Sequence, residues 1–301
     1  MKKILNKIKY YYNYIIANYL KRKEIDNGNN CFTIMSDEEL VDKIINGKSY
    51  SRFGDGELSL ICNNEFKLNF QNNNELLRNK LKEVLNSNLD NLIIGINYSF
   101  NNPNIYNKKV QKYCRTFNYL YRDKYKKIIP LDKVYGNSSI TRFYIDYDNS
   151  GLSGANYRIN NLKRIWNNKK VLIVEGDKTK LGVGNDLFSN CLNIRRIIVP
   201  SINAFEAYNN ILNSIKQNVA KNEIVLMAVG PTATVLAYDL AKIGIHSVDI
   251  GHIDIEYEWM KLKAKKRVAI KGKYVNEIRG KKYIESSNTD SNYLNSIIDR
   301  I

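Results

Sequence analysis

Two carboxylates with one glycine between them mark the segment YSRFGDGELSL, residues 50–60. Asp55 and Glu57 flank Gly56, and Arg52 lies three residues before Asp55. Glycine adopts backbone angles that other residues avoid, so we expect a sharp turn that aims both carboxylates at one point. Such oxygen ligands suit Mg²⁺ or Mn²⁺ completed by substrate phosphates. By itself the segment predicts a solvated loop equally well, because Asp-Gly is a common turn dipeptide.

A second acidic segment, residues 249–258, directly follows a predicted strand. If a helix begins there, His252 and Glu256 are four residues apart and share one face. A side chain of this kind can act as general base toward a hydroxyl nucleophile. We favour Glu256 for that role, with His252, Asp254 and Glu258 as alternatives. For His252, a scaffold role is as well supported as a site role.

Glycine and lysine are concentrated in residues 175–185, read EGDKTKLGVGN, between a predicted strand and a predicted helix. A glycine-rich turn in this position can cradle a diphosphate on free backbone N–H groups. The segment matches neither the Walker loop nor the dinucleotide fingerprint. Lys178 and Lys180 add positive charge.

Another such junction is VGPTAT, residues 229–234. Pro231 suits the first turn of a helix, where its missing N–H costs little. Thr232 or Thr234 then offers a hydroxyl beside free N–H groups, which favours anion binding. An ordinary well-capped helix explains the same residues.

The elements around these segments predict a parallel sheet with helices on its faces. Ser36 and Glu39 form a capping box that starts a helix. In a parallel sheet ligands bind beyond the carboxyl ends of the strands, which is where the segments above fall. Strands are expected at 92–96, 140–144, 171–174, 196–199, 224–229 and 247–250, and helices at 76–85, 105–128, 157–166, 186–191, 204–216 and 232–242.

Composition narrows the class of protein. The 301 residues carry a formal net charge of +17, which favours anionic partners such as nucleic acid, acidic lipid or phosphorylated small molecules. The four cysteines form no Cys-x-x-Cys pair, which argues against zinc and for reduced thiols inside the cell. Only two histidines are present, so histidine-rich metal sites are excluded.

Residues 1–23 show apolar positions at helical spacing among lysines and arginines. The apolar part is too short and interrupted to span a membrane, and no signal-peptide cleavage site follows it. A basic amphipathic helix on an anionic membrane surface fits the pattern, and a helix packed on the protein fits it as well. We expect residues 24–35 to be a linker and residues 36–301 to form the main domain, with a nucleotide-binding part at about 166–260.

Together the segments resemble the GT-D class of bacterial glycosyltransferases, over about residues 36–301. The resemblance implies a Rossmann-like α/β fold with helices on both faces of the sheet. It also implies transfer of a hexose from a UDP-sugar to a growing glycan, with Mn²⁺ or Mg²⁺ bound through an Asp-x-Glu motif that Asp55 and Glu57 match. The resemblance is carried by SRFGDGE (51–57), TRFYIDY (141–147), VEGDKTKLGVGNDLF (174–188), VPSINAFEAY (199–208), 229–259 and GKYVNE (272–277).

We therefore predict a metal-dependent glycosyltransferase of cell-surface polysaccharide or glycoprotein synthesis. It would be cytoplasmic or peripheral at the inner face of the membrane, with a glycan or glycoprotein acceptor and no nucleic acid. The alternatives are a nucleotide-dependent phosphotransferase or hydrolase, and a basic protein that binds nucleic acid or membrane. The residues expected to hold the nucleotide and its diphosphate are Arg52, Arg142, Gly176, Lys178, Leu181, Gly182 and Thr232.

Overall fold

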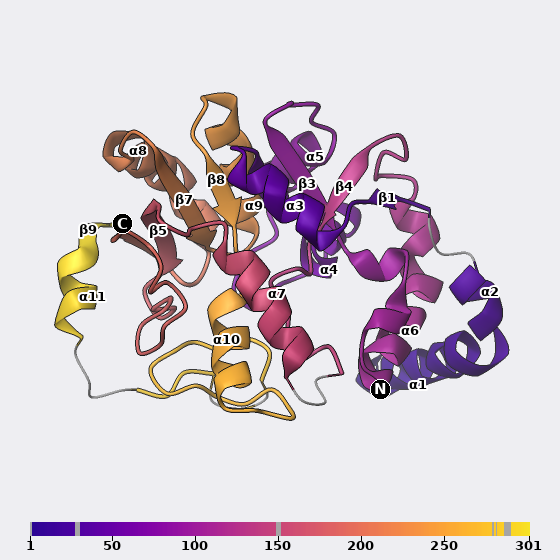
Figure 1. The fold of residues 1–301 in the computed structure, drawn as a ribbon. Coiled ribbons are helices and arrows are strands. Elements are labelled where there is room, and N and C mark those ends of the chain that lie inside the picture. Colours follow the sequence, from indigo (N-terminus) through magenta and orange to yellow (C-terminus); the bar gives the residue numbers. More distant parts are fainter. Residues whose placement is uncertain (1, 28–30, 149–151, 279, 281, 286–289) are drawn as a thin grey trace.

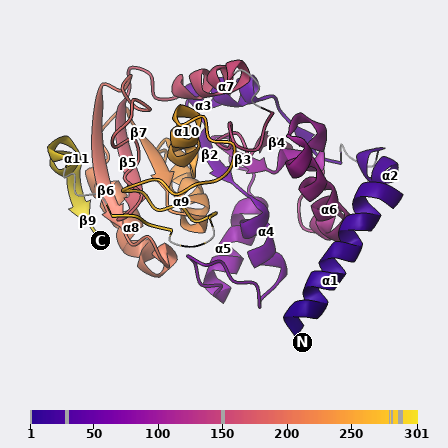
Figure 2. The same ribbon diagram turned by 90° about the horizontal axis from the view of Figure 1, so that it is seen from below.

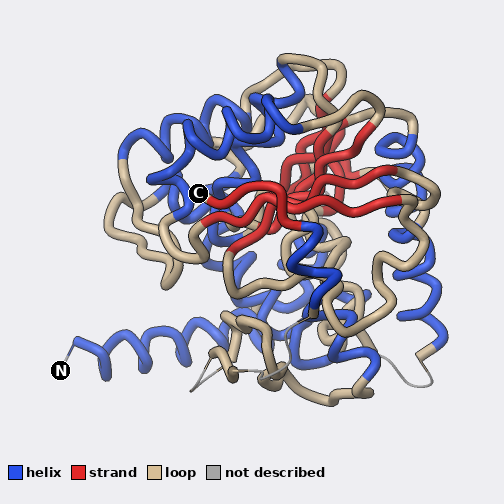
Figure 3. Tube along the Cα trace, turned by 90° about the vertical axis from the view of Figure 1, so that its left-hand side faces the viewer, coloured by secondary structure: helices blue, strands red, loops and turns tan. Residues whose placement is uncertain are grey.

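The computed structural model describes residues 2–27, 31–148, 152–278, 280, 282–285 and 290–301. Its centre is one nine-stranded sheet in the order β1-β4-β3-β2-β8-β7-β5-β6-β9, and every strand pair in it is parallel (Figures 1 and 3). The strands are β1 Thr33–Ile34, β2 Ser49–Arg52, β3 Leu92–Ile96, β4 Val134–Asn137, β5 Lys170–Gly176, β6 Asn193–Val199, β7 Glu223–Ala228, β8 Ser247–Asp249 and β9 Ile297–Arg300.

Helices cover both faces of this sheet, and a separate buried apolar cluster lies on each face. One cluster takes side chains from α4 (Asp55–Cys62), α5 (Glu75–Leu85), α6 (Lys108–Tyr125), α8 (Tyr208–Asn218) and α9 (Pro231–Lys242). The other takes them from α3 (Asp37–Ile45), α7 (Ser153–Lys163) and α10 (Ile253–Lys261). The remaining helices are α1 Lys2–Ile15, the π-helix Ile16–Leu20, α2 Arg22–Asn27, α11 Ser291–Ser296 and three 3₁₀ turns, Tyr98–Phe100, Pro103–Ile105 and Ala204–Ala207.

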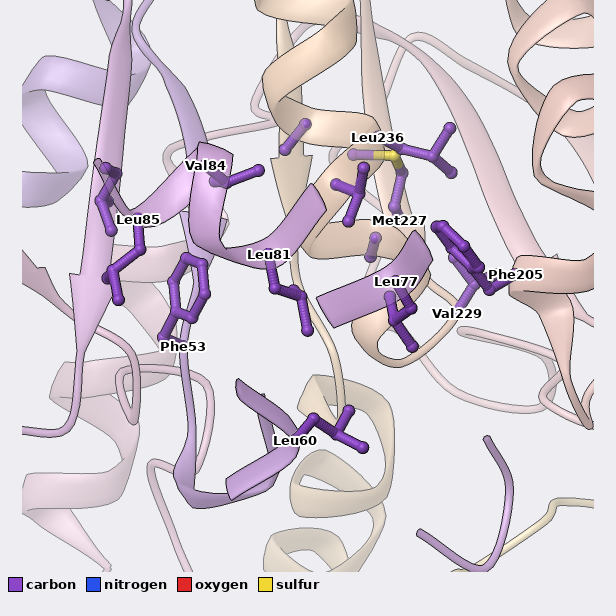
Figure 4. Close-up of a cluster of buried hydrophobic side chains, with 14 of the residues drawn as sticks. Phe53, Leu60, Leu77, Leu81, Val84, Leu85, Phe205, Met227, Val229 and Leu236 are labelled. Atoms are coloured by element: carbon purple, nitrogen blue, oxygen red, sulfur yellow. The ribbon is translucent and has the colours of Figure 1, made fainter. Parts of the chain in front are cut away.

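Strand β5 shows why the sequence forms a sheet buried on both sides. Val171 and Ile173 belong to one apolar cluster, and Leu172 and Val174 belong to the other. Side chains alternate along a strand, so a continuous apolar run is needed when both faces are covered. Figure 4 shows the cluster beneath α5, where side chains of that helix gather with Phe53, Phe205 and Met227.

The α/β fold predicted from the sequence is confirmed, including helices on both faces and the parallel sheet. Ser36 is also confirmed as the N-cap of α3, since its Oγ accepts from the Glu39 N–H at 3.1 Å. Two predicted elements are wrong: residues 186–191 form turns rather than a helix, and residues 140–144 form turns and irregular backbone rather than a strand. The turn expected at residues 54–56 is instead the start of α4.

The segment expected to be a linker is more ordered than predicted where the structure describes it. Residues 22–27 form α2, and Thr33–Ile34 pairs with β4 as the edge strand β1. Phe32 is buried against Phe100, so apolar burial continues to the edge of the sheet. Residues 28–30 of the predicted linker lie outside the described part.

The chain order places one edge of the sheet where a ligand site is expected. From β5 the chain forms β6 on one side of β5 and then β7 on the other, which is a topological switch point. In open α/β sheets ligands bind in the crevice beyond the carboxyl ends of the strands at such a point. Strand β8 pairs with both β7 and β2, so the loops after β2 and β8 reach the same crevice.

Candidate active site

A cleft of about 1490 Å³ opens at this carboxyl edge. It is lined by residues that follow β2, β4, β5, β6, β7 and β8, and by the C-terminal segment 265–278. Ligand sites are usually the largest concave feature of a protein, with a few convergent polar groups. Here those groups include Arg52, Asp55, Glu57, Arg142 and His252.

Asp55 and Glu57 lie in the first turn of α4, where the positive end of the helix favours carboxylates. Glu57 Oε2 accepts from the N–H of Gly54 at 2.9 Å, and Asp55 Oδ1 accepts from the N–H of Gly56 at 3.1 Å. The second oxygen of Asp55 accepts from the Tyr113 hydroxyl at 3.0 Å. Helix geometry, and not a sharp turn, therefore presents both carboxylates to the cleft.

The environment of this pair suits a cation. Burial raises the pKa of Glu57 to about 7, and the Asp249 and Asp55 carboxylates add to the shift. A divalent ion beside Glu57 would relieve that repulsion. Among the described residues, no three His, Cys, Asp or Glu side chains gather as a complete metal cage. The pair thus fits Mn²⁺ or Mg²⁺ of the kind that takes further oxygens from a phosphate ligand and water.

Arg52 is fixed at the end of β2 by contacts within the protein. Its guanidinium donates to Asp249 Oδ1 at 3.0 Å, to the Ser138 carbonyl at 3.0 Å and to the Thr141 hydroxyl at 2.7 Å. Gly251 has a φ of +43°, and a Cβ there would lie 1.8 Å from Arg52 Nη2. Arg52 lines the cleft, but most of its hydrogen-bonding capacity is already used to join the end of β2 to the loop after β4 and to the end of β8.

Arg142, His252 and Glu277 form one cluster on the cleft wall. Glu277 Oε1 accepts from Arg142 Nη2 at 3.0 Å and lies 3.1 Å from His252 Nε2. Burial lowers the pKa of His252 to about 4, and Arg142 and Arg52 also disfavour its charged form. Burial by itself would raise the pKa of Glu277, but neighbouring positive charge lowers it, and beside a neutral His252 that charge comes from Arg142 and Arg267. The cluster therefore holds a neutral imidazole beside an ionised carboxylate.

Glu256, the residue favoured as general base, lies away from the cleft surface. Its side chain is fully buried, and Oε2 accepts from the backbone N–H groups of Tyr144 and Ile145 at 3.0 and 2.9 Å. Burial raises its pKa to about 7. The structure therefore places Glu256 as an anchor for the loop after β4, which is a correction to its expected position.

Asp254 and Glu258, the alternatives for the base, belong to a buried network. Asp254 accepts from the Gly182 N–H at 3.0 Å and from Lys273 Nζ at 2.6 Å. Lys273 also lies 2.9 Å from Glu258, and Asn185 donates to both carboxylates. These contacts hold the glycine-rich loop 175–185 and the C-terminal segment against α10.

The residues predicted to hold the nucleotide divide into two groups. Gly176 and Leu181 line the cleft, together with Arg52 and Arg142. Lys178 is exposed outside the cleft lining, Gly182 is turned toward Asp254, and Thr232 is fully buried in α9 with its hydroxyl unpaired. From the segment 229–234, Val229 and Gly230 line the cleft, and Thr232 does not.

Buried side chains of β5 and β6 also fix the loop 175–185. Glu175 is fully buried, and its Oε2 accepts from the Leu181 N–H at 2.6 Å. Arg196 pairs with the other oxygen of Glu175 and donates to the Leu181 carbonyl at 2.8 Å. The cleft wall at Leu181 is therefore fixed to β5 and β6 through both its N–H and its carbonyl.

Family comparison agrees with this geometry. Residues 50–278 match the model of the family described as "Glycosyltransferase GT-D fold". The chain belongs to the GT-D glycosyltransferase family. Solved structures of the same kind share the fold: one described as having "a distinct glycosyltransferase fold" is 33% identical with a TM-score of 0.81, over 90% of this chain and 96% of that one. A glycosyltransferase from Streptococcus sanguinis gives the same identity and TM-score, over 90% and 99%.

Two curated relatives of this GT-D chain are longer proteins. Glycosyltransferase GlyD of Streptococcus pneumoniae serotype 4 is 33% identical over 266 residues, which is 88% of this chain and 32% of GlyD. The probable glycosyl transferase Gly of Streptococcus gordonii is 34% identical over 248 residues, 81% of this chain and 35% of the relative. The chain thus spans about a third of the length of these relatives.

For three residues that line the cleft, the sequence predicted no individual role. Asp249 was within the acidic segment, but its partner Arg52 is 197 positions away. Glu277 ends the segment GKYVNE, which carried the resemblance without a role for any residue. Tyr113 lies in a helix rich in tyrosine and lysine, and nothing local distinguishes it from its neighbours.

Proposed function

We propose that the chain transfers a hexose from a UDP-sugar to a hydroxyl of a glycan or glycoprotein acceptor, with Mn²⁺ or Mg²⁺ as cofactor. The observation that supports this most directly is the Asp55–Glu57 pair at the start of α4, facing a cleft at the carboxyl edge of the sheet. The family to which the chain belongs supports glycosyl transfer as the reaction class.

Each protein group has a part in this proposal. Asp55 and Glu57 hold the metal, which when bound neutralises charge on the diphosphate leaving group. Arg142 lines the same cleft and adds positive charge there. The loop that carries Gly176 and Leu181 forms the wall against which the nucleotide lies.

His252 is the better placed base. It lines the cleft, and its Nε2 lies 3.1 Å from Glu277; in the neutral tautomer that donates from Nε2 to this carboxylate, Nδ1 is the acceptor. In the transfer, the acceptor hydroxyl loses its proton to Nδ1 and its oxygen bonds to the anomeric carbon. The bond from that carbon to the diphosphate breaks, and UDP leaves with the electron pair. Glu277 stabilises the imidazolium that forms.

The test is release of UDP from UDP-glucose, UDP-galactose and UDP-N-acetylglucosamine, measured with and without a glycan acceptor, and with Mn²⁺ and again with EDTA. We expect metal-dependent release from at least one donor. Absence of UDP release with every donor would overturn the proposal. Release of inorganic phosphate from the nucleotide in place of UDP would favour the phosphotransferase or hydrolase alternative.

We also propose a peripheral position at the inner face of the membrane, with a role in cell-surface polysaccharide or glycoprotein synthesis. Helix α1 contains lysines and no acidic residue, and it exposes Leu5 and Ile8 at 58% and 62%. Basic helices with an apolar side bind anionic lipid surfaces. No helix among the described residues is long and apolar enough to cross a membrane.

Vesicle sedimentation tests the membrane contact. Vesicles containing phosphatidylglycerol should retain the wild-type chain and release much of the variant Leu5→Glu/Ile8→Glu. Equal sedimentation of both proteins would argue against contact through α1.

A further inference from the structure

A second groove, of about 340 Å³, continues from the cleft beside Asp55. The two hollows share Asp55, Gly56, Leu68 and Tyr113 as lining residues. The groove lies among α4, α6 and α1, and Figure 2 shows α1 running alongside α6. A molecule in this groove would therefore reach the carboxylates proposed to hold the donor's metal.

The lining of the groove is aromatic. Tyr113, Phe117, Tyr121 and Tyr125 recur every four residues along α6, so they share one helix face. Successive ring centroids are 6.1, 5.1 and 5.9 Å apart. Tyr10 of α1 joins this row from outside the region matched by the family model.

Three of these rings keep free area toward solvent. Tyr10, Tyr113 and Tyr121 are 47%, 46% and 40% exposed. Polar groups lie among them: Asp55, Asn63 and Lys124 line the same groove. The Ser59 and Tyr125 hydroxyls are 3.1 Å apart there.

This combination matches a sugar ring in chemical terms. One face of a pyranose presents C–H groups that pack on an aromatic ring, and its edge presents hydroxyls that need hydrogen-bonding partners. Tyrosine supplies a rigid apolar face with a polar tip, at small cost in conformational entropy. An acyl chain in the same groove would bury Asp55 and Lys124 against groups that cannot hydrogen-bond, which is unfavourable.

We propose that this groove binds a sugar residue of the acceptor, with Tyr10 and Tyr121 as the stacking platforms. The inference rests on the proposed function, because the groove gains its meaning from the donor site beside Asp55. It assigns a substrate-binding role to α1, which completes the groove through Tyr10.

Saturation-transfer NMR with methyl glucoside, methyl galactoside and maltose tests the groove directly. We expect transfer from the protein to the pyranose C–H protons of at least one probe. Tyr121→Ala and Tyr10→Ala should each weaken binding of that probe about tenfold, the loss expected for one good contact. Tyr121→Phe, which keeps the ring, should bind within about threefold of wild type.

Tyr157→Ala is the matched control, since Tyr157 is an exposed tyrosine on α7 and lines neither hollow. It should bind the probe like wild type. Circular dichroism on each variant separates loss of the contact from loss of fold.

Dodecyl maltoside below its micellar concentration distinguishes a sugar site from a lipid site. Equal affinity for maltose and dodecyl maltoside supports the proposal. Binding that requires the dodecyl chain, or a lack of Tyr121-dependent binding for every sugar probe, overturns it. UDP release is measured on the same samples, so failure of the donor reaction with intact sugar binding would count against the proposed function alone.

Discussion

The chain has two short acidic segments that look similar in sequence and differ in what surrounds them. Asp55 and Glu57 begin α4 and face a cleft, with backbone N–H groups as their main partners inside the protein. Asp254, Glu256 and Glu258 lie in α10, and they bind Lys273, backbone amides and Asn185. The first segment has room for a ligand, and the second is committed to the scaffold.

The difference shows that the hydrogen-bonding and ionic partners of a carboxylate within the protein, more than its position after a strand, decide whether it can bind a ligand or supports the fold. A buried carboxylate is stable only when it is paired or hydrogen-bonded. In α10 those partners come from the loops 143–146 and 175–185 and from the C-terminal segment. Of the acids of α10 only Asp254 lines the cleft, next to His252 just before that helix, and its carboxylate is already paired with Lys273.

The largest effect expected from this comparison is the loss of activity in Asp55→Asn. If the proposed metal site is correct, removing one of its two carboxylates should lower metal-dependent UDP release about a thousandfold. The unfolding free energy should change by no more than about 0.5 kcal/mol, because Asp55 is exposed. The measurements are initial rates at saturating Mn²⁺ and urea denaturation.

Glu65→Gln is the matched control for Asp55→Asn. Glu65 is an exposed acid just after α4 that does not line the cleft. It should keep wild-type rates. Wild-type turnover in Asp55→Asn would show that the metal lies elsewhere.

Much of the fold was predictable because it follows from local patterns. Strands β5 and β7 are apolar runs of the correct length, and Ser36 with Glu39 marks a helix start. The helix predicted at residues 186–191 was wrong because of contacts with distant residues. Asp186 bonds to Lys163, Tyr257 and Lys261, and these contacts hold the chain in turns. Distant contacts of this kind leave no periodic signal in the sequence.

The site was predictable only in part, for the same reason. Asp55 and Glu57 both line the cleft, as expected, because they lie within three residues and the resemblance covers them; that they bind a metal stays a prediction. The misplacement of Glu256 arose because its partners, the Tyr144 and Ile145 amides, are more than 100 residues away. The sequence of a helix does not reveal that its acidic side chains are buried when a loop distant in the sequence covers them.

The second prediction concerns the scaffold acids. Lys273→Met leaves Asp254 and Glu258 buried without their shared cation. Breaking such a pair should lower the unfolding free energy by about 3–4 kcal/mol. Urea denaturation measures it, and Lys271→Met, at an exposed neighbouring lysine, is the control. Equal stability of the two variants would mean that the network contributes little.

Glu256→Gln separates an anchor from a base. Glutamine still offers one oxygen to the Tyr144 and Ile145 amides, so we expect a loss of about 1–2 kcal/mol in stability. Hexose transfer, measured as UDP release, should stay within about tenfold of wild type, because the side chain does not reach the cleft. A loss of about a hundredfold or more in kcat with an intact fold would restore Glu256 as general base. His252→Gln, measured in parallel, should show that larger loss.

The smallest effect, and the one most specific to the α4 segment, is a pH-dependent stability of Glu57. Its pKa is raised to about 7 by burial, so the folded chain binds this proton more tightly than the unfolded chain. The stability from this group is therefore greatest at low pH and falls as pH rises from about 4.5 to 7. Glu57→Gln removes that dependence, and should therefore become more stable relative to wild type as the pH rises from 4 to 8.

Mn²⁺ should reverse the order of wild type and Glu57→Gln at pH 8. The ion binds the ionised carboxylate, so it stabilises wild type above pH 7 and has a smaller effect on the glutamine variant. Urea midpoints at pH 4 and pH 8, each with and without Mn²⁺, measure both effects. If Mn²⁺ stabilises the two proteins equally at pH 8, Glu57 is not a ligand. The raised pKa would then reflect only burial and neighbouring carboxylates, as burial and Asp146 raise the pKa of Glu256 in the scaffold segment.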